Sequence, residues 1–187
     1  MQNCDKVSIQ LPLGGHSFSL EGLSVNDEAR VEFVVDTHKV TLAPRECVSL
    51  DTAEELLRAV GKGCATTEHS VCSELQEAVV AVMAIDSKTL TAIVERFGVR
   101  ASFSSPLLDM RHNGERCLTI DVSANDCYMH LFDNGLQRAA AYEATSAEDY
   151  LYYVNEWLGG EHTTIYVKGR RDVAKLLSKY YKRVVCE

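Results

Sequence analysis

The sequence predicts an α/β (α+β) protein with mixed sheets, formed by two halves that each follow the order β-β-β-α-β-α. The first observation is the pattern of residues 115–187, where three strand-like segments precede alternating helix and strand patterns. The second is that residues 7–103 follow the same order in a weaker form. A polar stretch at 111–114 separates the two patterns, so we expect one domain at 1–112 and a second at 113–187.

The second half carries the clearer signals. Residues 118–122 alternate between apolar and polar side chains, which is typical of a half-buried strand. The Asn134-Gly135 pair between two such patterns predicts a tight hairpin, because both residue types accept positive φ angles. Thr145 and Glu148 form a capping-box pattern ahead of an apolar helical stripe. The expected strands are 117–123, 127–133, 136–142, 164–168 and 184–186, and the expected helices are 147–158 and 172–181.

The first half is predicted to open with an antiparallel meander. Its first two strands would be joined at Gly14-Gly15, since paired glycines accept the backbone of a hairpin turn. Asp51 and Glu54 then form a capping-box pattern at the start of a helix. The segment 78–85 is almost wholly apolar, which predicts a strand in the middle of a sheet, covered on both faces. The other expected strands are 7–13, 16–20, 30–36, 39–42, 69–75 and 99–103.

The composition predicts an ordinary globular protein without a membrane span. The longest apolar run, 78–85, is far shorter than the roughly 20 residues that a spanning helix needs. No basic segment followed by an apolar core opens the chain, so we expect a cytoplasmic protein. The net charge of −8 disfavours nucleic acid as a partner, because phosphate binding needs dense Lys and Arg. One basic cluster, from Lys168 to Arg183, is interpreted mainly as the solvated face of the last helix.

The seven cysteines predict free thiols rather than a metal site. Their number is odd, and no two of them sit at Cys-x-x-Cys spacing. Cys64, His69 and Cys72 are the nearest candidate ligands, but their irregular spacing does not match a zinc site. No cysteine lies in a recognisable nucleophile turn, and a lone histidine on a strand, such as His130, is more often structural. Acyl transfer by Cys and His is therefore disfavoured.

An internal repeat is indicated by two segments that share a layout. Residues 80–102 and 164–186 both read strand, short link, helix, strand. The apolar stripe of the first helix superimposes on that of the second with a constant offset, although identity between the copies is close to nil. Chance agreement of two amphipathic patterns is the alternative explanation.

Four short segments resemble the actin-like ATPase superfamily, which includes sugar kinases and heat-shock, pilus-assembly and cell-division proteins. They are residues 7–10, 39–44, 150–153 and 165–169. Within the superfamily the chain looks like a small bacterial family of unknown function. The resemblance covers nearly the whole chain and implies two ribonuclease H-like halves without the large insertions of other members. It also implies that any ATP would bind between the halves.

In active members of this superfamily, each half offers a loop between two strands that begins with Asp and soon contains Gly. Its backbone N–H groups hold phosphates, and carboxylates order Mg²⁺ and its waters. The second half keeps Asp121, but Ser123 stands where Gly is expected, and Asn125 completes the candidate ligands of this loop. The adenosine motif, normally a glycine pair before a helix, keeps only Gly169. Arg170 and Arg171 beside it are the candidates to hold a phosphate through bidentate hydrogen bonds.

The corresponding loop of the first half departs further from the pattern. Gln10 replaces the Asp and Pro12 replaces the Gly, and proline removes a backbone N–H that a phosphate would need. Gly14 and Gly15, two residues further on, are the remaining candidates for an anion-binding turn. The resemblance therefore implies a degenerate, non-hydrolysing member with no catalytic residue, no metal site and no required cofactor.

Two functions compete on these features. The first is a non-catalytic module that acts through an unidentified protein partner, since the loops are eroded and tyrosine is enriched at interfaces. The second is an ATP-binding protein or weak ATPase that uses Asp121 for Mg²⁺ and Gly169 with Arg170 for the nucleotide. The tyrosines considered for an interface are Tyr142, Tyr150, Tyr152, Tyr153, Tyr180 and Tyr181.

A ribonuclease H-like nuclease is a third hypothesis. Two-metal chemistry requires converging carboxylates around metals about 4 Å apart. Asp121, Glu148 or Asp149, and Asp172 occupy roughly suitable positions in the predicted order of elements. The acidic charge balance and the helix-capping roles open to these residues disfavour it.

Overall fold

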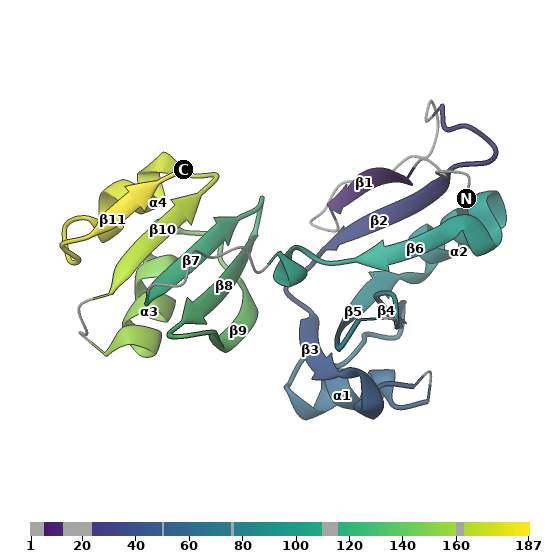
Figure 1. The fold of residues 1–187 in the computed structure, drawn as a ribbon, viewed down its shortest axis with the longest axis horizontal. Helices are drawn as coiled ribbons and strands as arrows, with labels where there is room; N and C mark the ends of the chain where they lie inside the picture. Colours follow the sequence, from purple (N-terminus) through teal and green to yellow (C-terminus); the bar gives the residue numbers. More distant parts are fainter. Residues whose placement is uncertain (1–5, 13–23, 50, 76, 110–115, 160–162) are drawn as a thin grey trace. The chain divides into compact units, whose positions relative to one another are not determined.

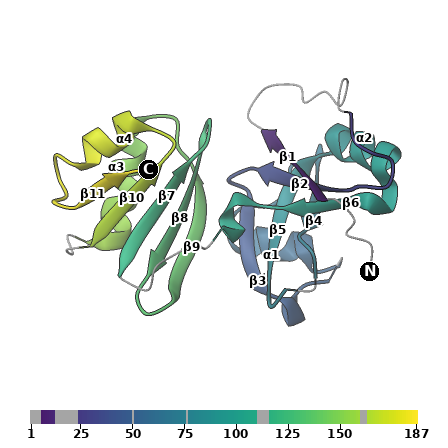
Figure 2. The ribbon, with the colours of Figure 1, turned by 45° about the horizontal axis from the view of Figure 1, so that its top comes forward.

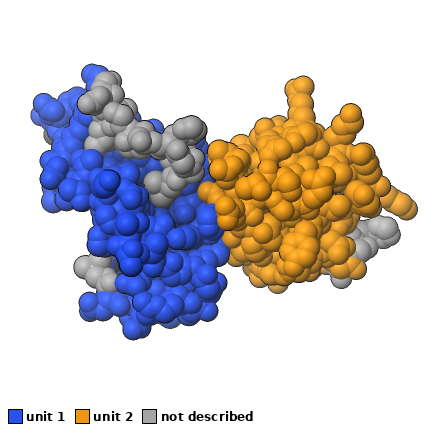
Figure 3. Space-filling model, turned by 180° about the vertical axis from the view of Figure 1, so that it is seen from behind, with its two compact units in different colours: residues 1–108 blue, residues 109–187 orange. Residues whose placement is uncertain are grey.

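The computed structural model describes residues 6–12, 24–49, 51–75, 77–109, 116–159 and 163–187. The chain divides into two compact units, residues 1–108 (unit 1) and 109–187 (unit 2), which Figure 3 shows in different colours. Both units pack helices against β-sheets, and both contain parallel and antiparallel strand pairs. The predicted mixed α/β class is therefore confirmed.

Unit 2 contains one five-stranded sheet in the order β11-β10-β7-β8-β9 (Figure 1). Strands β7, β8 and β9 are antiparallel neighbours, whereas β10 is parallel to both β7 and β11. The β8–β9 hairpin turns at Asn134 and Gly135, whose φ angles of 55° and 130° are the positive values expected for this pair. The strands are β7 (Cys117–Val122), β8 (Asp126–Phe132), β9 (Leu136–Glu143), β10 (Thr164–Lys168) and β11 (Val184–Cys186).

Two helices, α3 (Ala147–Leu158) and α4 (Arg171–Leu177), pack with one face of this sheet into a single hydrophobic core. Leu118 and Ile120 on β7 point to that face, because side chains two residues apart lie on the same side of a strand. Val154 and Trp157 of α3 and Leu177 of α4 complete the centre of the core. Helix α4 ends four residues before the expected end at residue 181.

Unit 1 contains two three-stranded sheets instead of one (Figures 1 and 2). The first has the order β1-β2-β6 and is wholly parallel, so the predicted antiparallel meander is wrong for β1 and β2. The second has the order β3-β5-β4 and is antiparallel. The strands are β1 (Lys6–Pro12), β2 (Arg30–Asp36), β3 (Val40–Pro44), β4 (Glu68–Cys72), β5 (Val79–Asp86) and β6 (Ala101–Ser104).

The predicted strand at 16–20 and the Gly14-Gly15 turn lie outside the described residues. The prediction for β5 is confirmed: it is the central strand of its sheet, and its residues 80–85 are all buried, so both faces are covered. Helix α1 (Ala53–Ala59) packs against this sheet through Leu57, beside Val82 and Ala84. Helix α2 (Ser87–Phe97) contacts the parallel sheet through Phe97, whose ring centroid lies 5.4 Å from that of Phe33 on β2.

The capping box of α3 forms one residue later than expected. The Ser146 hydroxyl accepts a hydrogen bond from the Asp149 N–H (3.3 Å), and the Asp149 carboxylate accepts one from the Ser146 N–H (2.8 Å). Thr145 contributes its own N–H to the same carboxylate (2.9 Å). The N-cap is therefore Ser146, and Glu148 remains exposed with no part in the cap.

The capping box predicted for α1 does not form. The residue before this helix is Thr52, whose hydroxyl accepts a hydrogen bond from the Ser49 N–H (2.9 Å) rather than from the helix. Glu54 pairs instead with Arg58 one turn later, at 2.6 Å. The prediction failed because Ser49 and Thr52 hydrogen-bond to each other before the helix begins.

The predicted repeat does not extend to strand pairing. β10 and β11, which flank α4, are parallel neighbours in one sheet. β5 and β6, which flank α2, lie in different sheets. The described part of unit 1 therefore does not repeat the arrangement of unit 2, although the order of strand, helix and strand is the same.

Candidate functional site

The candidate ligands of unit 2 meet at the carboxyl ends of the parallel strands β7 and β10. In the register of this pair, Asp121 lies opposite Lys168. The Lys168 Nζ atom is 3.1 Å from Asp121 Oδ2, and the two side chains are 55% and 33% exposed. The carboxyl ends of parallel strands are where ligands commonly bind in α/β sheets. Asp121 thus lies at this ligand-binding edge, where the Lys168 side chain is paired with it.

Gly169 follows Lys168 directly at this edge, where its backbone lies close to the backbone at the end of β7. Its φ of +99° is a conformation that other residues rarely adopt, and a Cβ atom here would lie 2.6 Å from the Val122 carbonyl oxygen. A glycine is therefore required at this position for packing between the end of β10 and the end of β7. This contact places Gly169 beside the loop that follows Asp121.

The loop between β7 and β8 uses part of its backbone internally. The Ser123 N–H donates to the Asp126 carbonyl (2.9 Å) and closes the turn. The Asn125 carbonyl accepts from the Ala144 N–H (2.8 Å), which joins the loop to the segment before α3. An anion-binding loop needs backbone N–H groups that point away from the protein. The Ser123 N–H is not one of them.

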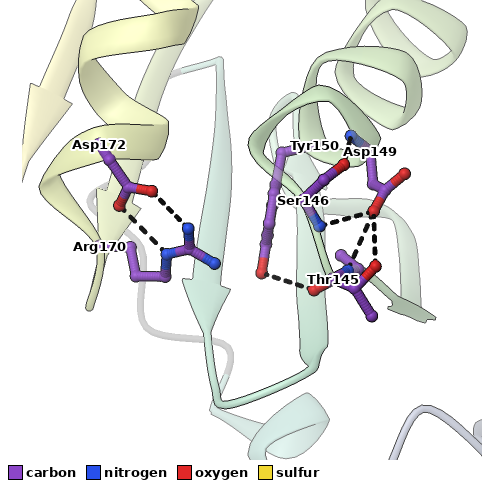
Figure 4. A network of polar contacts seen from close by, with 7 residues as sticks. Thr145, Ser146, Asp149, Tyr150, Arg170 and Asp172 are labelled. Carbon is purple, nitrogen blue, oxygen red and sulfur yellow. Dashed lines mark hydrogen bonds and ion pairs between the residues drawn. The ribbon is translucent and has the colours of Figure 1, made fainter.

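Arg170 is held by a carboxylate two residues along the chain (Figure 4). Its Nε donates to Asp172 Oδ1 (3.1 Å), and its Nη2 pairs with the other carboxylate oxygen, so the guanidinium forms a fork on Asp172. These hydrogen bonds raise the pKa of Arg170 and lower the pKa of Asp172. The guanidinium also lies over the ring of Tyr150, 5.9 Å from its centroid. Of the two arginines predicted to hold a phosphate, Arg170 is thus engaged within unit 2, whereas Arg171 is exposed and has no ion pair with a described residue.

The Tyr150 hydroxyl is buried beside this fork. It donates to the Ala144 carbonyl over 3.4 Å, as Figure 4 shows. Burial raises the pKa of Tyr150 to about 12, so this phenol is neutral at physiological pH. Tyr150 therefore belongs to the core rather than to an exposed binding surface.

The carboxylates of the nuclease hypothesis do not form a metal site. Asp121 is paired with Lys168, Asp149 caps α3, and Asp172 is paired with Arg170. Within the described residues, no three His, Cys, Asp or Glu side chains lie close enough together to hold a metal ion. The nuclease hypothesis has no support in this arrangement. Cys64, His69 and Cys72 likewise do not form a cluster that could hold a metal ion.

The buried thiols are poor candidates for nucleophiles. Burial raises the pKa of Cys64, of Cys72 and, most strongly, of Cys127. A raised pKa removes the thiolate that attacks a substrate. These three cysteines act as small apolar groups, in agreement with the sequence-based expectation.

Two surface features of unit 2 were missed at the sequence level. One is a groove of about 370 Å³ between α4 and β11. The other is a ladder of aromatic rings between β9 and α3, which we call the aromatic ladder and which consists of Trp157, Tyr142, Tyr153 and Tyr152. The sequence shows the tyrosines and the basic run, but it does not show which of them share a surface, because that depends on the pairing of distant strands.

The comparisons with known proteins identify the class of fold. No family model matches the chain, and neither does any curated protein. A solved structure that it matches with a TM-score of 0.68 has the actin-like ATPase fold, and the resemblance predicted from the sequence is thereby confirmed at the level of fold.

One such structure is a Bacteroides thetaiotaomicron protein with an actin-like ATPase fold and unknown function. It matches with a TM-score of 0.68 and 21% identity, over 84% of this chain and 68% of that one. The cytoplasmic domain of EpsL, an inner membrane component of the type II secretion system of Vibrio cholerae, matches with a TM-score of 0.45 and 12% identity, over 87% and 81% of the two chains. The PilM–PilN type IV pilus biogenesis complex matches with a TM-score of 0.40 and 13% identity, over 86% and 71%.

Proposed function

We propose that this chain is a non-catalytic protein-interaction module with a degenerate actin-like ATPase fold, derived from two ribonuclease H-like halves. The observation that carries the proposal is the ion pair between Asp121 and Lys168. A carboxylate that orders Mg²⁺ must be open to the metal, but here an ammonium group lies 3.1 Å from it. The positive charge of Lys168 beside this carboxylate opposes the binding of a second cation there.

The neighbouring groups support the same conclusion. The guanidinium of Arg170, which would hold a phosphate, forms its fork on Asp172 instead. The Ser123 N–H closes a turn. A nucleotide would have to replace each of these interactions with one of its own, and the exchange gives little net free energy.

The aromatic ladder supports a role in protein contacts. The Tyr142 hydroxyl accepts a hydrogen bond from Trp157 Nε1 (2.9 Å), and the Tyr142 and Tyr153 rings are stacked with centroids 4.1 Å apart. Tyr152 meets Tyr153 edge-on at 5.4 Å and is 65% exposed. Rings fixed in this way lose little entropy on binding, and aromatic residues are enriched at the centres of interfaces. The exposed end of the ladder is therefore a suitable contact surface.

Nucleotide binding or weak ATPase activity is the second candidate. The observation that favours it is the close approach of Gly169 to the Val122 carbonyl, which keeps the two loops of an ancestral site together at one sheet edge.

Under the first proposal, by contrast, we expect ATP and Mg²⁺ to be dispensable, and we expect a protein partner in the cytoplasm. No helix in the described part of the chain is long and apolar enough to cross a membrane.

Thermal unfolding with and without millimolar Mg·ATP tests the nucleotide part of this proposal. A ligand present at about 100 times its Kd would stabilise the protein by about 2.7 kcal/mol, which raises Tm by several degrees. We expect no shift in the wild type, nor in Asp121→Asn or the matched variant Asp133→Asn. A shift in the wild type and in Asp133→Asn that disappears in Asp121→Asn would establish the nucleotide site and overturn the proposal.

Co-purification with a tagged chain tests the interaction part. Tyr152→Ala removes the exposed end of the aromatic ladder, so we expect this variant to lose a partner that the wild type retains. Tyr180→Ala is the matched control, because Tyr180 is also 65% exposed and has no ring contact among the described residues. Equal recovery of the partner with both variants would contradict a role for the ladder.

A further inference from the structure

Basic charge is concentrated in one short segment of this acidic chain. Residues 168–183 contain seven Lys or Arg and one Asp, a net charge of +6. The other 171 residues contain 12 basic and 26 acidic residues, a net charge of −14. Lys168 and Arg170 pair with carboxylates, whereas the remaining five cations are exposed and form no ion pair with any described residue. These five are Arg171, Lys175, Lys179, Lys182 and Arg183.

Two of these cations line the groove between α4 and β11. On the helix side, the groove is lined by one face of α4 and the residue after it, namely Arg171, Ala174, Lys175 and Ser178. On the sheet side, it is lined by Val184, Cys186 and Glu187. Arg171 and Lys175 are one turn apart, and like charges at this spacing destabilise a helix. The pair therefore does not serve the stability of α4, and its position in a groove indicates a ligand of opposite charge.

The groove lies beside a free sheet edge. Among the described strands, β11 stands last in its sheet and pairs with β10 alone, and Figure 1 shows it next to α4. The Arg183 carbonyl and the Glu187 N–H bond to β10. Because successive backbone groups alternate in direction along a strand, those of Val184 and Cys186 point to the open edge. An unpaired edge of this kind accepts another strand.

We propose that an acidic, extended segment of a partner protein adds to β11 as a sixth strand and places alternate carboxylates in the groove against Arg171 and Lys175. This inference rests on the proposed function and specifies the chemistry of the partner. Backbone bonds to Val184 and Cys186 supply the affinity, and the two cations select the acidic side chains. Side chains two residues apart on an added strand lie on one face, so alternation of acidic residues matches the groove.

A peptide fits these observations better than nucleic acid does. A duplex or long single strand tracks many phosphates and needs an extended basic surface. Here the groove holds two cations, and the rest of the chain repels a polyanion. The free backbone edge also has no counterpart in a nucleic acid, whereas an extended peptide pairs with it directly.

Fluorescence anisotropy with a labelled peptide of alternating glutamate and valine tests the proposal on the full chain. We expect binding that weakens with salt and that falls about tenfold or more in the double variant Arg171→Glu/Lys175→Glu. Lys179→Glu/Lys182→Glu is the matched control, because it changes the net charge equally but lies outside the groove. We expect it to retain most of the affinity. Circular dichroism melts establish that both variants fold.

A second peptide tests strand addition without any change to the protein. It has the same side chains, but its backbone nitrogens that would face β11 are N-methylated, and we expect it not to bind. Equal losses in the two charge variants, full binding of the methylated peptide, or no peptide binding at about 1 mM would each overturn the proposal. So would a single-stranded oligonucleotide that binds more tightly than the peptide through Arg171 and Lys175. None of these results depends on Mg·ATP, so this proposal and the proposed function fail separately.

Discussion

The two units of this chain contain similar numbers of strands but arrange them differently. Unit 2 places β7 to β11 in one sheet with a single core under α3 and α4. Unit 1 divides its strands between a parallel and an antiparallel sheet. The helices and sheet of unit 2 share one core, whereas α1 of unit 1 packs with β5 in a smaller cluster.

The position of charged pairs differs in the same way. In unit 1, Lys6 and Glu32 pair across the parallel strands β1 and β2 near the start of β1, with Nζ and Oε1 2.7 Å apart. In unit 2, Lys168 and Asp121 pair across β10 and β7 at the carboxyl end. Only the second position is one where an α/β sheet binds ligands. The same kind of cross-strand ion pair thus lies away from the ligand-binding edge in unit 1 and at that edge in unit 2, where our proposed function has it oppose metal binding.

Matched leucine substitutions test whether the two cores are independent, and we expect them to have the largest effects. Leu118→Ala removes a fully buried side chain from the large core of unit 2 and should cost about 4 kcal/mol. Leu57→Ala, in the smaller cluster under α1, should cost about 2 to 3 kcal/mol. The measurement is urea unfolding followed by both tryptophan fluorescence and circular dichroism.

The chain has one tryptophan, Trp157, and it lies in the core of unit 2. Fluorescence therefore reports unit 2, whereas circular dichroism reports both units. We expect Leu118→Ala to move the fluorescence transition and Leu57→Ala to move only the circular dichroism transition. If Leu57→Ala shifts both transitions equally, the units unfold as one and the comparison between two cores is wrong.

The elements of unit 2 could be predicted because their signals are local. Alternation at 118–122, the Asn134-Gly135 turn and the apolar stripe of α3 each depend on a few neighbouring residues, and the structure confirms all three. Unit 1 was harder, since the parallel pairing of β1 with β2 joins residues that are 24 positions apart in the sequence. The glycine pair at 14–15 between them predicted a hairpin and gave no sign of this parallel pairing. Parallel pairing leaves no local mark in a sequence.

The candidate ligands Asp121 and Gly169 were proposed from the resemblance, and their role as ligands stays a prediction. The structure brings the end of β7 and the start of the loop after β10 together at one sheet edge. That Lys168 pairs with Asp121 follows from the register of β10 on β7, which joins residues 47 positions apart. The spacing of Arg170 and Asp172, two residues apart, is compatible with their ion pair, but the basic residues around Arg170 favoured a phosphate as its partner. Gly14 and Gly15 lie outside the described residues and remain a prediction.

A glycine pair sharpens the comparison at the level of close packing, with an intermediate effect. Gly169→Ala in unit 2 should cost about 3 kcal/mol, because the new Cβ would meet the Val122 carbonyl at 2.6 Å in addition to the strain of φ +99°. Gly61→Ala in unit 1, at φ +74° with no atom within 4 Å, should cost about 1 kcal/mol from backbone strain alone. Urea unfolding by circular dichroism measures both, and equal costs would show that the close approach is unimportant.

The helix caps give the smallest expected effect and a direct test of a correction. Ser146→Ala removes the hydroxyl that caps α3 and should cost about 1 kcal/mol. Asp51→Ala, at the capping box that unit 1 does not form, should change stability by less than about 0.5 kcal/mol, because its exposed side chain makes no hydrogen bond with any described residue. A loss of about 1 kcal/mol in Asp51→Ala would restore the sequence-based prediction.

The pH dependence of stability separates the α3 cap from other contributions. Hydrogen bonds from the Ser146 and Thr145 N–H groups lower the pKa of Asp149 below its unfolded value of about 3.9. The unfolded chain therefore takes up the proton first, so this contribution is present above about pH 4 and is lost as the pH falls through the folded pKa. Asp149→Asn should be less stable than the wild type at pH 6, and the two should converge once the pH falls below the folded-state pKa of Asp149. A constant difference across this range, measured by urea unfolding with Trp157 fluorescence, would mean that the carboxylate charge does not stabilise the cap.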